Sequence, residues 1–245
     1  MGVIGVKNSL SGMVGDVVVR EFNGKKIMQS RPRKHKKSKA VQESSTEFVY
    51  ASRFGKDLRE KLSSILMKYQ DVNMYRRFLS ALYKTLQMND EYPKGERRFS
   101  NTDLSPLVGF DFNINSPWSE YATVPMKFNR VSKTSLEVEI SKQETSKGIY
   151  FPDYSSQVEL VLVCYSYAES SSEPHEESVF KMPIKEGKGI EEAISFSFDI
   201  ASDATLVFVV ATLFYEDNRS KVVKSYMNNI DLHPCQLVYA ESGDV

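Results

Sequence analysis

Two nearly unbroken apolar runs constrain this fold more than any other feature: QVELVLVCYSY at 157–167 and TLVFVVATLFY at 205–215. Both are rich in β-branched and aromatic residues, which favour strands. A strand that is apolar on both sides of its pleat needs cover on both faces of its sheet. The two runs therefore predict central strands of a sheet that is buried from both sides.

Shorter candidate strands surround these runs, and several alternate apolar with polar residues as half-buried strands do. The candidates are ATVPMKFN (122–129), SLEVEIS (135–141), ESVFKMP (177–183), EAISFSFD (192–199) and KVVKSYMN (221–228). Seven short strands separated by turn residues predict an antiparallel, immunoglobulin-like β-sandwich over residues 116–245. The cysteine–tryptophan–cysteine core of antibody domains is absent from the sequence, so the predicted likeness is one of architecture.

The period of the apolar residues changes to three and four between residues 46 and 88, which predicts two amphipathic helices. Ser44 to Thr46 offer N-caps for the first helix, and a break at 69–71 separates it from the second. The short break predicts an antiparallel helical pair. With the N-terminal strands, these helices make an α+β protein whose first domain is residues 1–115.

The N-terminal segment predicts a β-hairpin, in which MVGDVVVREF (13–22) meets Asn23-Gly24 and KKIMQS (25–30) returns. Val17 and Val19 share one face of the first arm. Gly12 and Gly15 fit tight backbone turns better than a phosphate-binding loop, because a strand-like run rather than a helix follows them. An isolated hairpin is marginal in water, so these four residues are candidates for docking on another surface.

A basic segment, RPRKHKKSK, follows the hairpin at 31–39. Residues 1–40 carry ten Lys/Arg against two Asp/Glu, a net charge of +8, so the other residues of this neutral chain carry −8. The segment predicts an exposed handle for a protein partner, for self-association, or for non-specific contact with nucleic-acid phosphates. Its candidate binding residues are Arg31, Arg33, Lys34, Lys36, Lys37 and Lys39.

Catalytic and metal-binding patterns do not emerge from the sequence. The three histidines, His35, His175 and His233, are scattered, and neither C-x-x-C nor H-E-x-x-H occurs. Asp111 and Glu120 could mimic a glycosidase pair, yet scattered carboxylates are usually surface residues. We therefore expect a protein that is not an enzyme, with no catalytic residue, no metal, no cofactor and no evident small-molecule substrate.

The sequence predicts a cellular compartment only through the targeting signals that it lacks. The chain has no apolar stretch long enough for a membrane span and no secretory signal pattern at its start. This predicts a cytoplasmic protein, and leaves open export without a signal or incorporation into a virion. The two cysteines, Cys164 and Cys235, do not form a disulfide framework, although a single bridge between them stays open.

Several segments resemble a family of uncharacterised proteins, a domain of unknown function, known chiefly from Bacteroidota-type bacteria. Its N-terminal pattern, close to S-G-x-x-G-x-V-V, is matched by Ser11-Gly12, Gly15, Val17-Val18, Gly24, Arg31 and Pro32. Later matches are DLSPLVGFDFN (103–113), VELVLVCYSY (158–167) and TLVFVVATLFYEDNRSKVVKSYMNNI (205–230). The chain departs from the family at Val18-Val19-Arg20, where the family tends to have a glycine after the valines, and in its denser basic run. The resemblance implies that the N-terminal segment is a defined element, and it supplies no activity.

Taken together, the patterns favour a non-enzymatic interaction or structural protein, part of a bacterial or phage-related assembly, that docks through its N-terminal strand and basic segment. The alternative is a nucleic-acid-associated protein that binds phosphates non-specifically through residues 31–39.

Overall fold

The computed structural model describes residues 2–4, 10–22, 25–31, 38–143, 148–169, 174–219 and 223–242. The chain divides into two compact units, Met1–Gln42 and Glu43–Val245, named here the N-terminal unit and the main unit. The predicted boundary between residues 115 and 116 falls inside the main unit. Helices and sheets together confirm the α+β class.

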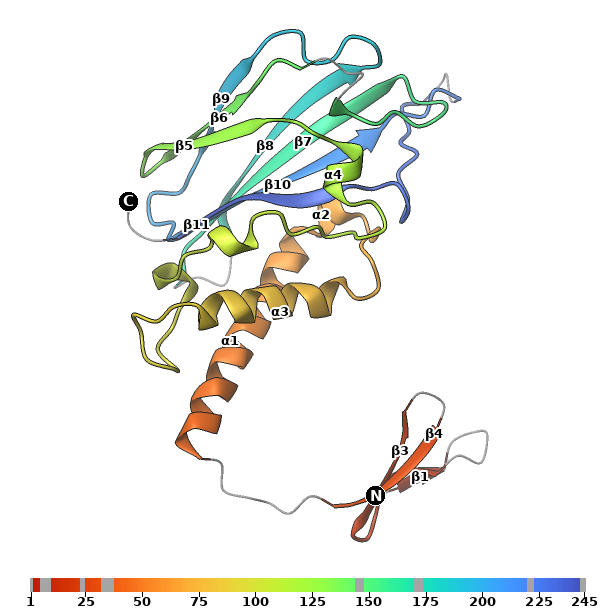
Figure 1. Ribbon diagram of the computed structural model, residues 1–245, viewed down its shortest axis with the longest axis vertical. Helices are drawn as coiled ribbons and strands as arrows, with labels where there is room; N and C mark the ends of the chain where they lie inside the picture. Colours follow the sequence, from red (N-terminus) through yellow and green to blue (C-terminus); the bar gives the residue numbers. More distant parts are fainter. Residues whose placement is uncertain are drawn as a thin grey trace. The chain divides into compact units, whose positions relative to one another are not determined.

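The N-terminal unit contains a four-stranded antiparallel sheet in the order β1-β2-β3-β4 (Figure 1). Its strands are Gly2–Ile4, Leu10–Val14, Val17–Phe22 and Lys25–Ser30. The predicted hairpin is present as β3 and β4, and two further strands extend it to a meander. The predicted turn residues, Asn23 and Gly24, lie outside the described residues.

The helical layer consists of α1 (Lys39–Lys61), α2 (Ser63–Leu66) and α3 (Met74–Gln87). The expected N-caps at 44–46 are wrong, because α1 begins seven residues before Thr46. Ser38 supplies the start instead: its hydroxyl accepts from the N–H of Val41 (3.4 Å) and its carbonyl from the N–H of Gln42 (3.0 Å). The sequence KHKKSK is too basic to resemble a helix start, which hid this cap.

The two long helices cross at an angle (Figure 1). Gly55 of α1 lies at the crossing, where a Cβ atom would stand only 2.8 Å from Cδ1 of Leu82 on α3. The glycine therefore lets the backbone of α1 approach α3 more closely than any other residue could. An antiparallel pair side by side was expected, and periodicity alone does not determine the crossing angle of two helices.

Irregular chain connects α3 to the sheets and carries two 3-10 turns, η1 (Phe99–Asn101) and η2 (Ser105–Leu107), and one short helix, α4 (Trp118–Tyr121). Leu104, Leu107 and Phe112 are buried in this connection. It is therefore an ordered part of the main unit, as its apolar residues predict.

Two antiparallel sheets complete the main unit. One has the strand order β11-β10-β7-β8 and the other the order β5-β6-β9. The strands are Met126–Ser132, Ser135–Ile140, Gln157–Tyr167, Pro174–Lys185, Ile194–Asp199, Leu206–Tyr215 and Cys235–Ser242, for β5 to β11 in turn. The strand expected at KVVKSYMN is wrong: its described residues make one isolated bridge, Glu216 to Tyr226, and the last strand is β11.

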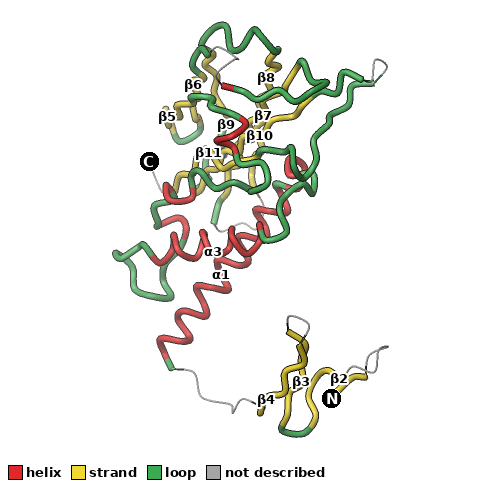
Figure 2. Tube along the Cα trace, turned by 45° about the vertical axis from the view of Figure 1, so that its right-hand side comes forward, coloured by secondary structure: helices red, strands yellow, loops and turns green. Residues whose placement is uncertain are grey.

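Three layers result, with the larger sheet in the middle (Figures 1 and 2). Along β7, Val161, Val163 and Tyr165 join the core beneath the helices, while Leu160, Leu162 and Cys164 join the core shared with the smaller sheet. Strand β10 alternates in the same way, and all ten of its residues are buried. The two apolar runs are therefore central strands covered on both faces, as the sequence predicts. One of the two covers is the helical layer.

Polar contacts tie the helical layer to the middle sheet. Tyr50 of α1 donates to Glu169, just beyond β7, at 2.5 Å. At the end of the same helix, the hydroxyl of Tyr165 donates to the carbonyl of Lys61 (3.3 Å). The middle and the end of α1 are thus both fixed to the sheet near the carboxyl end of β7.

Candidate functional site

The register of the N-terminal sheet brings three of the predicted docking residues to one face. Val19 of β3 lies between Gly12 of β2 and Met28 of β4, and Val17 is paired with Val14 of β2. Direct cross-strand partners share a face, and so do residues two apart on one strand. Val14, Val17, Val19 and Met28, together named the valine face, are therefore side by side.

The valine face is buried at its centre and exposed at two of its four residues. Val19 is 5% exposed, and it is the single buried residue among those whose burial is described in the N-terminal unit. Val14 is 49% exposed and Met28 is 71% exposed. Exposed apolar side chains gathered on one face mark interaction surfaces.

Backbone geometry explains the two predicted glycines. Gly15 has φ of +59° and forms the β2–β3 turn with Asp16, whose carbonyl accepts from the N–H of Arg31 (2.6 Å). The tight turn expected at Gly12 is wrong: this glycine lies inside β2 with φ of +102°, and it adds no side chain to the valine face. Both positions favour glycine because other L-residues are strained at these angles. A strand rather than a helix follows Gly15, so the geometry of a phosphate loop is not formed here.

The basic segment is described only at its ends. Arg31 follows β4 and Lys39 is the first residue of α1, and both are exposed. Arg33, Lys34, Lys36 and Lys37 lie outside the described residues. The charge boundary coincides with the boundary between the units: residues 1–42 hold the same ten cations and two anions, so the N-terminal unit carries +8 and the main unit −8.

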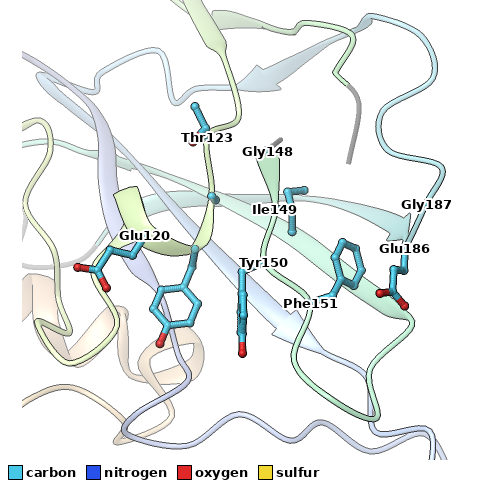
Figure 3. Close-up of a pocket in the computed structure, with 10 residues that line it drawn as sticks. Glu120, Thr123, Gly148, Ile149, Tyr150, Phe151, Glu186 and Gly187 are labelled. Carbon is cyan, nitrogen blue, oxygen red and sulfur yellow. The ribbon is translucent and has the colours of Figure 1, made fainter. Parts of the chain in front are cut away.

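A hollow of about 570 Å³ is lined by residues 120–123, 148–151 and 186–187 of the main unit (Figure 3). The rings of Tyr121 and Tyr150 meet edge to face with centroids 5.4 Å apart, and the N–H of Tyr150 donates to the carbonyl of Tyr121 (2.9 Å). Glu120 and Glu186 lie on either side of these rings (Figure 3). The described lining has neither a histidine nor a cysteine.

Asp111, paired with Glu120 in the glycosidase hypothesis, has a structural task. Its carboxylate accepts from the N–H of Trp118 (3.0 Å), at the start of α4, and from the side-chain amide of Gln236 (3.0 Å). Glu120 instead lines the hollow. The structure therefore gives these two carboxylates different surroundings.

His233 is fully buried and all of its polar atoms have partners. Nε2 donates to the carbonyl of Ile65 (2.8 Å), which fixes the tautomer, and Nδ1 then accepts from the amide of Asn228 (3.0 Å). Burial lowers the pKa of His233 to about 4. A neutral imidazole with both nitrogens bonded joins α2 to the end of β10 through Asn228, which makes it an architectural residue.

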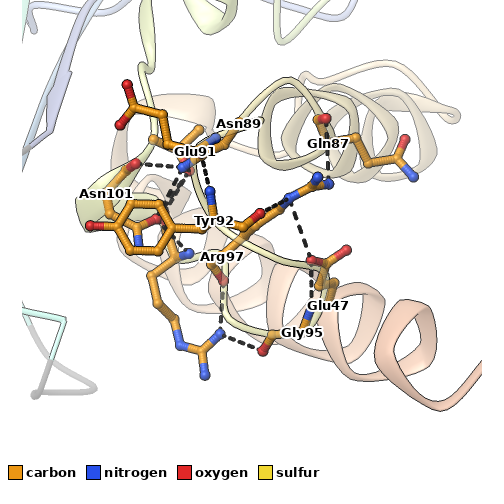
Figure 4. A network of polar contacts seen from close by, with 10 residues as sticks. Glu47, Gln87, Asn89, Glu91, Tyr92, Gly95, Arg97 and Asn101 are labelled. Atoms are coloured by element: carbon orange, nitrogen blue, oxygen red, sulfur yellow. Dashed lines mark hydrogen bonds and ion pairs between the residues drawn. The ribbon is translucent and has the colours of Figure 1, made fainter. Parts of the chain in front are cut away.

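A second polar network surrounds Glu47 on α1 (Figure 4). Its Oε1 accepts from the N–H of Gly95 (2.8 Å) and lies 3.9 Å from Nε of Arg97, and both charged side chains are buried. Arg97 also donates to the carbonyls of Tyr92 and Gln87. The network fastens the loop after α3 to α1, because a buried charge needs a partner and hydrogen bonds.

The two cysteines lie on opposite faces of the middle sheet, Cys164 in the core between the sheets and Cys235 in the core beneath the helices. Both are free thiols. Burial raises the pKa of Cys164 to about 12 and raises that of Cys235 as well. The open possibility of a bridge between them is therefore excluded by the geometry.

Sequence reasoning missed Val14 and Met28 as members of the valine face. The signal was present in the expected hairpin, because a two-residue turn at Asn23-Gly24 pairs residue 22 with 25 and hence Val19 with Met28. Val14 follows in the same way from the glycine turn at 15–16, which pairs it with Val17.

None of the helices in the described residues is both long and apolar enough to cross a bilayer. Within the same residues, no three His, Cys, Asp or Glu side chains gather in a group that could hold a metal ion.

Comparison with known proteins adds no support to the family resemblance described above. The sequence matches no protein-family model, and it matches none of the curated proteins.

Proposed function

We propose that this chain is a non-enzymatic interaction protein that docks through its N-terminal sheet. The observation that carries the proposal is the exposure of the valine face, with Val19 as the single buried residue among those described there. A unit of about 40 residues seldom buries enough apolar surface to be stable alone, unless disulfides, a metal or association contribute. Contact with another surface would complete the missing core.

The composition of the N-terminal unit favours association over the other two means of stabilisation. Residues 1–42 contain no cysteine, one histidine and two carboxylates. They therefore offer no disulfide and too few ligands for a structural metal site. A protein surface that covers the valine face remains as the source of stability.

Electrostatics would steer the docking. The N-terminal unit carries +8 and the main unit −8. Opposite charges of this size accelerate encounter between protein surfaces, and salt screens the effect. We assign Arg31 to Lys39 the role of attracting an acidic partner surface, and the valine face the role of holding it.

We further propose that the main unit carries this element on an immunoglobulin-like sandwich. With β5, β6 and β9 as strands A, B and E, and β7, β10 and β11 as C, F and G, the two sheets have the immunoglobulin strand order. Strand β8 then takes the place of C′ beside C. Backbone nuclear Overhauser contacts that failed to place β6 between β5 and β9 would contradict this assignment.

Deletion of residues 1–38 tests the docking role, because it removes the sheet and most of the basic segment and leaves α1 intact from Lys39. We expect the full chain to form a larger species by light scattering and the truncated chain to be monomeric, with unchanged circular dichroism per main-unit residue. The same oligomeric state for the two chains would refute the docking role.

A matched variant separates the sheet from the charges. Replacement of Lys34, Lys36, Lys37 and Lys39 by Gln leaves the valine face unchanged and removes four cations. We expect this variant to associate more slowly and with less dependence on salt, while still reaching the larger species at high concentration.

Nucleic-acid binding is the second candidate, and the +8 charge of the N-terminal unit favours it. Six Lys/Arg between 31 and 39 predict a slope of about −5 when the logarithm of the binding constant for a DNA duplex is plotted against that of salt concentration. The four-Gln variant is the control. A flat salt dependence, or binding that survives in this variant, would exclude the candidate.

A further inference from the structure

We propose that the partner of the valine face is the valine face of a second copy of this chain, so that two N-terminal sheets stack face to face. This inference rests on the proposed docking function and names the partner of the same surface; the −8 main unit of the second copy is then the acidic surface that attracts the basic segment. It starts from two charged residues at one end of that face. Glu21 of β3 and Lys26 of β4 are direct cross-strand partners and both are exposed.

The charges lie on the same side of the sheet as the valine face. Glu21 is two residues beyond Val19 on β3, and Lys26 is two residues before Met28 on β4. Alternation along a strand therefore directs all four side chains to one face. The face has an apolar middle, with one acid and one base side by side at its end.

A face of this kind is self-complementary under two-fold symmetry. An axis that runs along the strands, between β3 and β4, places β3 of each copy over β4 of the other at the same height. Glu21 then faces the second copy's Lys26, and Val19 faces its Met28, in two reciprocal sets. Such an interface, in which residue i meets j and j meets i, is the isologous contact that two-fold dimers use.

Stacking also gives Met28, 71% exposed, an apolar neighbour. Facing sheets pack about 10 Å apart, a distance that side chains from both sheets fill. The overlap is about two strands wide, so the buried area falls below the roughly 1,200 Å² of standard protein interfaces. We therefore expect a weak and reversible dimer, observed over chain concentrations from about 10 µM to 1 mM.

Charge exchange tests the arrangement. In Glu21→Lys, every copy has lysine at both positions, and in Lys26→Glu every copy has glutamate at both. Like charges then face each other in either homodimer, and we expect each variant alone to dimerise at least about tenfold more weakly than the natural chain. In an equal mixture, a Glu21→Lys chain can pair with a Lys26→Glu chain, so that opposite charges face each other. We expect these mixed dimers to form.

The mixture separates contacts between copies from contacts within one sheet, because the cross-strand pair inside each variant chain stays repulsive. It also guards against misfolding, since two misfolded variants would not restore each other. The control is Arg20→Glu, a charge reversal on the opposite face of the same strand, next to Ile27. We expect it to leave the dimer unchanged within about twofold.

Sedimentation equilibrium of the full chain and the variants gives a clear decision. The stacking is overturned if the average molar mass of the mixture is no higher than that of either variant alone. It is also overturned if the natural chain stays monomeric throughout the concentration series. If the natural chain associates, loses association on deletion of residues 1–38, and yet the mixed variants remain apart, the stacking is wrong and the docking function stands. If that deletion leaves association unchanged, the docking function itself fails.

Discussion

Strands β3 and β10 have similar sequences but differ in how far their side chains are buried. VVVREF and LVFVVATLFY are both rich in β-branched residues, and both form antiparallel strands with a neighbour on each side. All ten residues of β10 are buried, whereas β3 has one buried residue among those described. The difference comes from layers: helices cover one face of β10 and a second sheet the other.

This contrast shows that strand propensity and burial are separate properties. A β-branched run is sufficient to specify an extended chain with partners, since the pleated backbone suits such residues. The hydrophobic free energy appears only when another layer removes the side chains from water. The main unit supplies its own layers, whereas in the docking function that we propose a second surface would supply one to the N-terminal sheet.

Truncation of a core aromatic residue should give the largest effect. Phe208 of β10 is 1% exposed and packs against Phe54 of α1, with ring centroids 5.8 Å apart. We expect Phe208→Ala to lower the free energy of unfolding by about 3–5 kcal/mol, because it leaves a cavity beneath the helices. The fluorescence of Trp118, the single tryptophan, follows unfolding of the main unit in denaturant.

Met28→Ala is the matched change in the N-terminal sheet. Met28 is 71% exposed, so its truncation should alter the same unfolding curve by less than about 0.5 kcal/mol. Similar losses for the two variants would mean that the N-terminal sheet shares the core of the main unit, and would remove the contrast between β3 and β10.

The covering layer has a buried charge whose loss should be nearly as costly. Glu47→Ala leaves Arg97 buried without its carboxylate and leaves the N–H of Gly95 unpaired. We expect a loss of about 3 kcal/mol or more. Chemical denaturation of the variant gives this number, and it measures how firmly the helical layer is held.

The same helix offers an exposed control pair. Lys56 and Glu60 lie 3.6 Å apart, and both side chains are more than 60% exposed. Glu60→Ala should cost no more than about 0.5 kcal/mol. If Glu47→Ala were equally mild, the network in Figure 4 would be incidental to stability.

Acid should weaken the main unit through His233. Its folded pKa of about 4 lies below the unfolded value of 6.5, so between these values the unfolded chain binds a proton that the folded chain does not. Stability is complete above pH 6.5 and is lost as pH falls, by about 3 kcal/mol in total at pH 4. Unfolding titrations at several pH values measure the slope.

His233→Gln is the comparison, because glutamine does not titrate and its amide can still donate to the carbonyl of Ile65. Carboxylates contribute to acid unfolding in both proteins, so the difference between the two curves reports His233 alone. Parallel curves from pH 6.5 to 4 would show that the histidine does not resist protonation.

Much of the main unit could be predicted from sequence because its signals are local. The two apolar runs predicted the central strands, and the three- and four-residue spacing of apolar residues predicted the helices. The crossing at Gly55 and the helical cover of β10 depend on which distant surfaces meet, and periodicity within one segment does not encode this. Strand β11 was missed because the apolar stretch of CQLVYAES is only four residues long, LVYA at 237–240, and the segment follows Pro234, a residue typical of turns.

For the candidate site, the sequence identified Gly12, Gly15, Val17 and Val19 but not their neighbours. Gly15 could be predicted because a turn with positive φ favours glycine. Val14 and Met28 needed the register of both turns, and their exposure needed the folded sheet, in which Val19 is buried while these two side chains are not. Which side chains of a face stay exposed is a property of the folded unit, and the sequence pattern does not predict it.

The smallest expected effect is also the sharpest test of the comparison. A chain of residues 39–245 should unfold, by Trp118 fluorescence at low micromolar concentration, within about 2 °C of the full chain, because the two units are separate compact bodies. We expect added salt to reduce this difference in unfolding temperature further, because salt screens any attraction between the +8 and −8 charges of the two units. A truncated chain that unfolds many degrees earlier would show that the main unit itself covers the valine face. In that case the partner of the N-terminal sheet would lie within the same chain, and β3 would owe its stability to the same layers as β10.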